Sequence, residues 1–221
     1  MDKQALNPFV FGFFSLYKTM AFDPKTQKPF LITLTGDLGS GKSSLAKRLC
    51  AYFEADYYST GSAQRKLAAK RGVSTLDLNK MAETDPSIDR EIDSIFENLA
   101  YEEKTYVVDS RMAWHFLPNS FKLRLTVEPE TGAVRILGDQ KRTMEGYEDV
   151  AEALEMIHKR KSSERSRFQN YYGVDTEDET NYDLIVDTTT LSHEAVFEKV
   201  RAAVERYLDE KAEEQNQAAS R

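Results

Sequence analysis

The sequence predicts an α/β fold, a three-layer sandwich with a five-stranded, mainly parallel sheet. Short apolar runs alternate with segments of helical periodicity, which is the pattern of strands joined by crossover helices. A glycine-rich stretch separates the first apolar run from the first helical segment, and acidic residues end two of the later runs. The predicted strands are Phe30–Thr35, Ala55–Ser59, Thr105–Asp109, Leu123–Val127 and Leu184–Asp187.

Helices are predicted from apolar residues spaced three and four apart and from residues that favour helix starts. Two such starts, at Ser74 and Asp85, lie between the second and third strands. This stretch is too long for a simple crossover, so we expect an inserted lobe. The sequence Glu-Pro-Glu-Thr after the fourth strand predicts a turn. The other predicted helices begin near Lys42, Ser62, Glu148 and Ser192.

The glycine-rich stretch fits the pattern G-x-x-x-x-G-K-[ST] in the strand–loop–helix context that a P-loop requires. Glycines allow positive φ angles, so successive backbone N–H groups can surround phosphate oxygens at a helix N-terminus. We therefore predict an ATP site with Mg²⁺. Lys42 would reach the β- and γ-phosphates, and the Ser43 hydroxyl would bind the metal. The predicted ATP-binding residues are Gly36, Asp37, Leu38, Gly39, Ser40, Gly41, Lys42, Ser43 and Ser44.

Composition limits the remaining function classes. The chain has 221 residues and a net charge of −7, which disfavours a general nucleic-acid binder. One cysteine allows no internal disulfide, and no apolar run is long enough to span a membrane. We expect a monomeric, cytoplasmic protein with no membrane or nucleic-acid partner. Residues 1–29, with a short aromatic helix over 9–16, are expected to form an extension, and residues 209–221 a charged tail.

Five stretches together resemble the cytidylate kinases, especially their compact archaeal-type branch, over about residues 30–205. The resemblance implies a nucleoside monophosphate kinase that moves the ATP γ-phosphate to CMP or dCMP. It also implies a kinase domain over 30–208, with a monophosphate-binding lobe over about 62–103 and a lid over about 132–175. The stretches are the P-loop, Ser59-Thr-Gly61 with Arg65, Pro86–Asp93, Val108-Asp-Ser-Arg111, and Arg160–Arg167 followed by Tyr172–Asp175 and Tyr182–Thr188.

The resemblance also assigns residues outside the P-loop. Arg65 and Arg111 match the clamp on the acceptor phosphate, since guanidinium forks bind phosphate in a bidentate way. Thr60 and Gly61 match residues beside the nucleoside, and Asp109 ends a strand where an acid would hold Mg²⁺ through water. The lid contributes Arg160, Arg165 and Arg167, with Glu164 binding the nucleoside or orienting the arginines. The expected catalytic set is Lys42, Arg111, Arg160, Arg165 and Arg167.

Two alternatives stay open from the sequence. An enzyme on the same scaffold could phosphorylate another nucleotide or a small hydroxylated metabolite, because the motifs do not specify which base is bound. The chain could instead be a nucleotide-responsive interaction protein with little turnover, in which the Phe-rich first thirty residues and the charged tail bind a partner.

Overall fold

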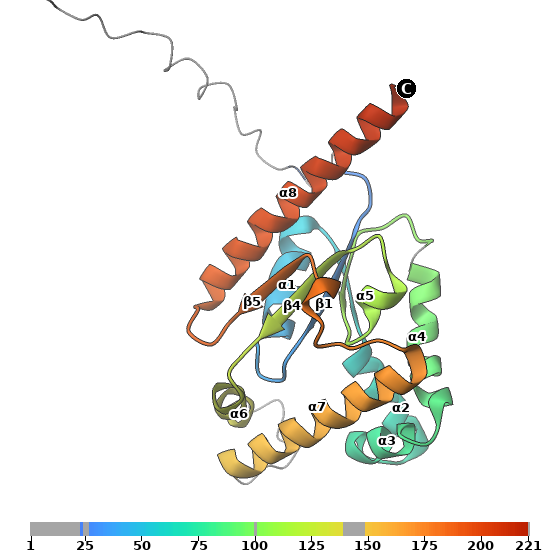
Figure 1. Ribbon diagram of the computed structural model, residues 1–221, viewed down its shortest axis with the longest axis vertical. Coiled ribbons are helices and arrows are strands. Elements are labelled where there is room, and N and C mark those ends of the chain that lie inside the picture. Colours follow the sequence, from blue (N-terminus) through green and yellow to red (C-terminus); the bar gives the residue numbers. More distant parts are fainter. Residues whose placement is uncertain (1–22, 24–26, 100, 139–148, 221) are drawn as a thin grey trace, which may run out of the picture.

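A parallel sheet forms the centre of the molecule. The computed structural model describes residue 23 and residues 27–99, 101–138 and 149–220. In this part of the chain the strand order is β2-β3-β1-β4-β5, and each neighbouring pair is parallel (Figure 1). This confirms the predicted α/β class. The strands are β1 (Leu31–Gly36), β2 (Asp56–Ser59), β3 (Tyr106–Asp109), β4 (Phe121–Thr126) and β5 (Leu184–Asp187).

Helices cover both faces of the sheet, which explains why its central strands are mostly buried on both sides. On one face, α1 (Lys42–Phe53) and α8 (His193–Ala219) pack in a cluster with Ile32 and Leu34. On the other face, α4 (Pro86–Leu99) and α5 (Ala113–Phe116) pack on Val108. Both faces of the middle strands are therefore removed from water.

The two helices expected between the second and third strands are present, together with the helix that follows β2. The three helices α2 (Thr60–Arg71), α3 (Thr75–Ala82) and α4 surround their own apolar cluster. Ser59 and Ser74 cap the first two, since their hydroxyls accept from backbone N–H groups at Ser62 and Asp77. This packing gives the predicted lobe a local core. Its buried members are Leu67, Ala68, Leu78, Ala82, Ile88 and Ile92.

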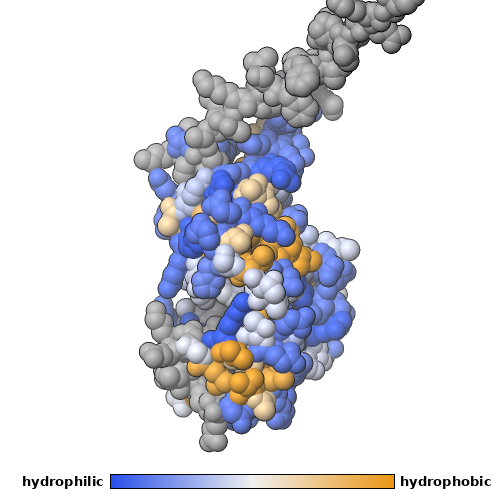
Figure 2. Space-filling model, turned by 90° about the vertical axis from the view of Figure 1, so that its left-hand side faces the viewer, coloured by the Kyte–Doolittle hydropathy of each residue, from blue (hydrophilic) through white to orange (hydrophobic). Residues whose placement is uncertain are grey.

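One prediction was wrong: the residues after the fourth strand form a helix, α6 (Pro129–Leu137), and no open turn. Proline is favoured at the first helical position, where its missing N–H costs nothing, and Glu130 suits the positive helix N-terminus. Apolar residues of α6 are exposed along its outer side and gather over this end of the molecule in Figure 2. They are Val134 and Leu137.

Two long helices complete the described chain. The helix α7 (Val150–Tyr172) starts at the capping carboxylate of Asp149 and ends at Gly173, which has a positive φ angle. In α8 the buried stripe ends at Leu208, but the helix continues to Ala219 with exposed residues only. The predicted tail is thus helical, because its Ala, Glu, Gln and Lys residues favour helix even without packing. The predicted aromatic helix over 9–16 lies outside the described residues.

Gly132 lets α6 pack directly on the glycine-rich loop. A Cβ atom on Gly132 would lie 2.8 Å from the Leu38 carbonyl oxygen, and one on Gly39 would lie 2.4 Å from the Gly132 carbonyl oxygen. We therefore expect Gly132→Ala to lower the free energy of unfolding by about 1–3 kcal/mol through overpacking. Gly138→Ala is the matched control, since its Cβ would meet nothing closer than 3.6 Å.

The measurement is urea unfolding of both variants, with binding of a non-hydrolysable ATP analogue as a second readout. Equal stability and equal nucleotide affinity for the two variants would contradict the close packing described here.

Candidate active site

A large cleft lies at the carboxyl ends of the strands, between the glycine-rich loop, the α2–α4 lobe and α7. Its volume is about 2320 Å³. Parallel sheets bind ligands at this edge because loops and helix N-termini meet there. The structure brings most of the predicted site residues to this cleft. Those lining it are Leu38, Gly39, Ser40, Gly41, Lys42, Ser43, Ser44, Thr60, Gly61, Arg65, Asp109, Arg111, Arg160, Glu164 and Arg167.

The glycine-rich loop has the backbone that its sequence predicts. Gly39 and Gly41 adopt φ angles of 79° and 87°, in the left-handed region that favours glycine. Gly36, at the end of β1, has a φ of 142°, and a Cβ atom there would lie 2.1 Å from the Leu125 carbonyl oxygen. The loop then turns into α1, whose N-terminal N–H groups open into the cleft. This arrangement is suited to binding an anion.

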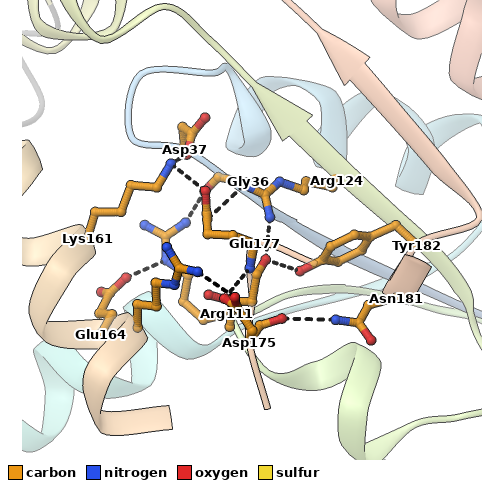
Figure 3. Close-up of polar contacts among 12 residues, drawn as sticks. Gly36, Asp37, Arg111, Arg124, Lys161, Glu164, Asp175, Glu177, Asn181 and Tyr182 are labelled. Atoms are coloured by element: carbon orange, nitrogen blue, oxygen red, sulfur yellow. Dashed lines mark hydrogen bonds and ion pairs between the residues drawn. The ribbon is translucent and has the colours of Figure 1, made fainter. Parts of the chain in front are cut away.

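Two cations meet at the Gly36 carbonyl oxygen. Lys42 Nζ donates to this oxygen at 2.7 Å and to the Asp37 carbonyl oxygen at 2.6 Å. The Arg111 guanidinium, which comes from the loop after β3, donates to the same Gly36 oxygen (Figure 3). The buried indole of Trp114 in turn donates to the Arg111 carbonyl oxygen at 2.9 Å. Lys42, at the start of α1, and Arg111, from the loop after β3, are thus held side by side.

Glu164 of α7 is the carboxylate that joins these cations to the helix. It is 8% exposed and lies 2.9 Å from Arg111 Nε and 2.8 Å from Arg160 Nε. Burial opposes ionisation of Glu164, but the charges of Arg111 and Arg160 outweigh it and lower its pKa to about 2. The carboxylate therefore remains charged at neutral pH and orients both guanidinium groups.

The remaining cations of α7 do not all face the cleft. Lys161 Nζ lies 3.3 Å from the Asp37 carboxylate and 2.8 Å from Glu177 (Figure 3), and Arg165 pairs with Asp175. Arg165, Gly36 and Asp37 line a smaller cavity of about 380 Å³, which shares Arg111, Arg160 and Glu164 with the cleft. Arg165 as a phosphate-binding residue stays a prediction that this arrangement does not support.

Arg167 lies at the lobe side of the cleft. Its Nε atom is 2.7 Å from the Asp89 carboxylate of α4, and another nitrogen donates to the Asn79 carbonyl oxygen at 3.3 Å. Both side chains of the ion pair are buried. Burial raises the pKa of Asp89, and the charge of Arg167 opposes that rise. Arg167 therefore pairs with the lobe, while its charge also helps to lower the pKa of Glu164.

The residues predicted beside the acceptor lie where β2 passes into α2. The Thr60 hydroxyl donates to the Asp109 carbonyl oxygen at 3.3 Å, which ties the start of α2 to the end of β3. Arg65 lies one turn further along α2 and donates to the Ser62 hydroxyl at 3.0 Å. The Arg65 side chain is solvent-accessible and lines the cleft, so it can reach an anion placed there.

The predicted metal ligands are close to a tyrosine that sequence reasoning missed. The Tyr57 hydroxyl donates to Asp109 Oδ2 at 3.1 Å. Burial raises the pKa of the Tyr57 phenol, as does the charge of Asp109, whereas the Ser59 and Ser43 hydroxyls lower it. In the described residues no group of three or more His, Cys, Asp or Glu could hold a metal alone. One carboxylate and one hydroxyl fit Mg²⁺, which takes its other ligands from phosphates and water.

Sequence reasoning also missed the role of Asp93 on α4. The Tyr172 hydroxyl donates to Asp93 Oδ2 at 2.8 Å, and Asp93 lines the cleft together with Asp89. Burial raises the Asp93 pKa to about 7, while its hydrogen bond with Tyr172 opposes the rise. Asp89 and Asp93 are four residues apart, which places them on one face of α4, and this spacing could have indicated that they act together. Lys161 and Tyr172 lie in stretches that carry the family resemblance, but the resemblance assigned no role to either, and no sequence pattern pointed to Tyr57.

Comparisons with known proteins agree with this geometry. The chain matches the Cytidylate kinase-like family over residues 31–190. It is 33% identical to the cytidylate kinase of Methanosarcina acetivorans over 79% of the chain and 96% of that relative. It is 36% identical to that of Haloarcula marismortui over 80% and 90% of the two chains. The shikimate kinase of Bacteroides thetaiotaomicron shares the fold at 14% identity, with a TM-score of 0.53. The match covers 81% of this chain and 97% of the shikimate kinase.

The fold and the loop therefore define a P-loop kinase, an ATP-dependent phosphotransferase. Within that class the chain belongs to the Cytidylate kinase-like family. This confirms the resemblance seen in the sequence. None of the helices in the described ranges is long and apolar enough to cross a membrane.

Asp93 makes stability depend on pH. Its carboxyl holds a proton up to about pH 7 in the folded protein, compared with about pH 4 in an unfolded chain. The folded state then binds more protons than the unfolded state between these values, so stability falls as pH rises through that window. We expect Asp93→Asn, which stays neutral, to melt at about the same temperature as the wild type at pH 4. At pH 8 it should melt at a higher temperature.

Calorimetry at both pH values is the measurement, with Asp209→Asn on the exposed end of α8 as the control. A difference between wild type and Asp93→Asn that is the same at pH 4 and pH 8 would show that Asp93 titrates normally.

Proposed function

We propose that this kinase transfers the γ-phosphate of ATP to CMP or dCMP. The observation that carries the proposal is the meeting of Lys42 and Arg111 at one carbonyl oxygen, that of Gly36. Lys42 belongs to the loop that would hold ATP, and Arg111 to the side that would hold the acceptor. The two phosphate groups must approach each other closely for transfer, and paired cations at this point offset their repulsion.

The proposed donor site uses the glycine-rich loop and the start of α1. Backbone N–H groups would surround the ATP phosphates, and Lys42 would exchange its two carbonyl acceptors for phosphate oxygens. Ser43 and Asp109 would hold Mg²⁺, directly or through water. When bound there, the ion would offset the negative charge on the phosphates.

The proposed acceptor site lies across the cleft. Thr60, Gly61 and Arg65 are contributed by the start of α2, and Arg111 by the loop after β3. In the reaction an oxygen of the acceptor phosphate attacks the γ-phosphorus of ATP. The bond from that phosphorus to the β–γ bridging oxygen breaks, and ADP leaves with the electron pair. Such transfer depends on positioning and charge stabilisation, so no separate base is required.

Arg111, Arg160 and Glu164 would act together during transfer. Glu164 holds both guanidinium groups by ion pairs at the wall of the cleft, where they would meet phosphate oxygens of bound substrates. The predicted lid over 132–175 would carry Arg160 toward the transferring group as α7 moves, and the part over 139–148 lies outside the described residues. Closure of this kind would exclude water from the site.

The Asp89–Arg167 pair supports selection of cytosine. It offers carboxylate acceptors and guanidinium donors at one wall of the cleft. Cytosine carries an amino group that donates, beside ring positions that accept. Uracil has a carbonyl oxygen in place of the amino group, so a carboxylate facing that position would meet an acceptor. We further propose that the enzyme works as a cytoplasmic monomer.

A panel of acceptors tests the proposed substrate. We expect ADP release from Mg²⁺·ATP to be strongly stimulated by CMP or dCMP, and weakly by UMP, AMP, GMP, dTMP and shikimate. The measurement is coupled ADP detection at equal acceptor concentrations. Strong stimulation by another compound alone would keep the phosphotransferase activity and overturn the proposed specificity.

Single substitutions test the two halves of the site. Lys42→Met should lower the rate by at least about 10²–10³-fold, because it removes the lysine charge that would stabilise the transferring phosphate.

Arg65→Ala should raise the KM for CMP and leave binding of an ATP analogue nearly unchanged. Arg90→Ala, an exposed arginine of the same lobe, is the matched control. Unchanged CMP kinetics in Arg65→Ala would rule out its assignment to the acceptor phosphate.

A further inference from the structure

Tyr57 presents its hydroxyl group to the predicted metal ligands. Side chains alternate along a strand, so Tyr57 and Ser59 share one face of β2 and Tyr58 points to the other. Tyr58 accordingly packs against Phe96 on the lobe side, with ring centroids 6.2 Å apart. The opposite face is the one covered by α1, where Ser43 lies. Because Ser59 pairs with Asp109 in the parallel register, the Tyr57 phenol reaches diagonally to that carboxylate.

The phenol contacts Asp109, one of the two predicted Mg²⁺ ligands. Its hydroxyl is 3.1 Å from Asp109 Oδ2. Tyr57 is 41% exposed and lines the cleft, so its contact with Asp109 is made at the site and not within the core. The phenol donates a hydrogen bond to the carboxylate, since an ionised carboxylate can only accept. This hydrogen bond is made to Oδ2, so Oδ1 is available to bind a metal ion or to accept another hydrogen bond.

We infer that Tyr57 is a positioning residue that holds the Asp109 carboxylate in place for Mg²⁺. The inference rests on the proposed function, in which Asp109 holds the metal. Groups that hydrogen-bond to a metal-binding side chain fix its orientation, and losing one typically costs about 10–100-fold in metal affinity. Asp109 ends a short strand next to an open cleft, so its side chain needs such a partner to stay in one orientation.

Tyr57→Phe removes the hydroxyl and keeps the ring, which makes it the direct test. We expect its affinity for Mn²⁺, measured by electron paramagnetic resonance in the presence of a non-hydrolysable ATP analogue, to fall about 10–100-fold. Affinity for the analogue without metal should stay the same. The rate with CMP should require more Mg²⁺ for half-saturation and recover toward the wild-type kcat at high Mg²⁺.

Tyr52→Phe is the matched control. Its hydroxyl donates to Glu205 Oε1 at 2.6 Å, so it is also a tyrosine–carboxylate pair, but it joins α1 to α8 away from the cleft. We expect Mn²⁺ affinity to be unchanged in this variant. An equal loss of Mn²⁺ affinity in both variants would mean that Tyr57 acts only through general stability, and the inference would be overturned.

Asp109→Asn separates this inference from the proposed function. If Asp109→Asn weakens Mn²⁺ binding and Tyr57→Phe does not, Asp109 holds the metal and Tyr57 does not position it. If neither variant weakens Mn²⁺ binding, the metal assignment of Asp109 is wrong and the inference fails with it. Phosphate transfer to CMP, measured separately with the wild type, then still decides the proposed reaction.

Discussion

The buried carboxylate of Glu164 is the interaction on which the arrangement of the cleft depends. It connects α7 to Arg111, which follows β3, and to Arg160, one turn earlier on its own helix. Removing one member of a buried ion pair leaves an uncompensated charge, at a cost of about 3–5 kcal/mol. The pairing therefore fixes where α7 crosses the carboxyl edge of the sheet, and with it the positions of the cations.

From this point α7 reaches both sides of the cleft. Toward the loop, Lys161 forms ion pairs with Asp37 and Glu177. Glu177 also pairs with Arg124. Toward the lobe, the Tyr171 hydroxyl donates to backbone carbonyls at the end of α3. Arg167 and Tyr172 pair with acids of α4, as described above. One helix thus contacts the glycine-rich loop and the α2–α4 lobe, so binding on one side can change the position of α7 on the other.

Much of the architecture could be predicted from local pattern. The β1 strand, the loop and α1 were recognisable because the loop requires glycine at fixed positions and the flanking segments are apolar with clear periods. Ser192 was recognised as a helix cap for the same local reason, and its hydroxyl accepts from Ala195 N–H. The helix α6 was missed, because Glu-Pro-Glu-Thr is compatible with a turn and with a helix start. Packing of Gly132 against the glycine-rich loop favours the helix.

Spacing within short segments was enough to predict the α/β class, the P-loop and the kinase family. The pairing of charged side chains follows from the folded arrangement of distant segments. Arg160, Arg165 and Arg167 are nearly equivalent in the sequence, yet they pair with Glu164, Asp175 and Asp89 respectively. Likewise, Tyr57 meets Asp109 only because β2 lies beside β3 in parallel register. Such contacts depend on the direction and burial of side chains from distant segments, which no local pattern encodes.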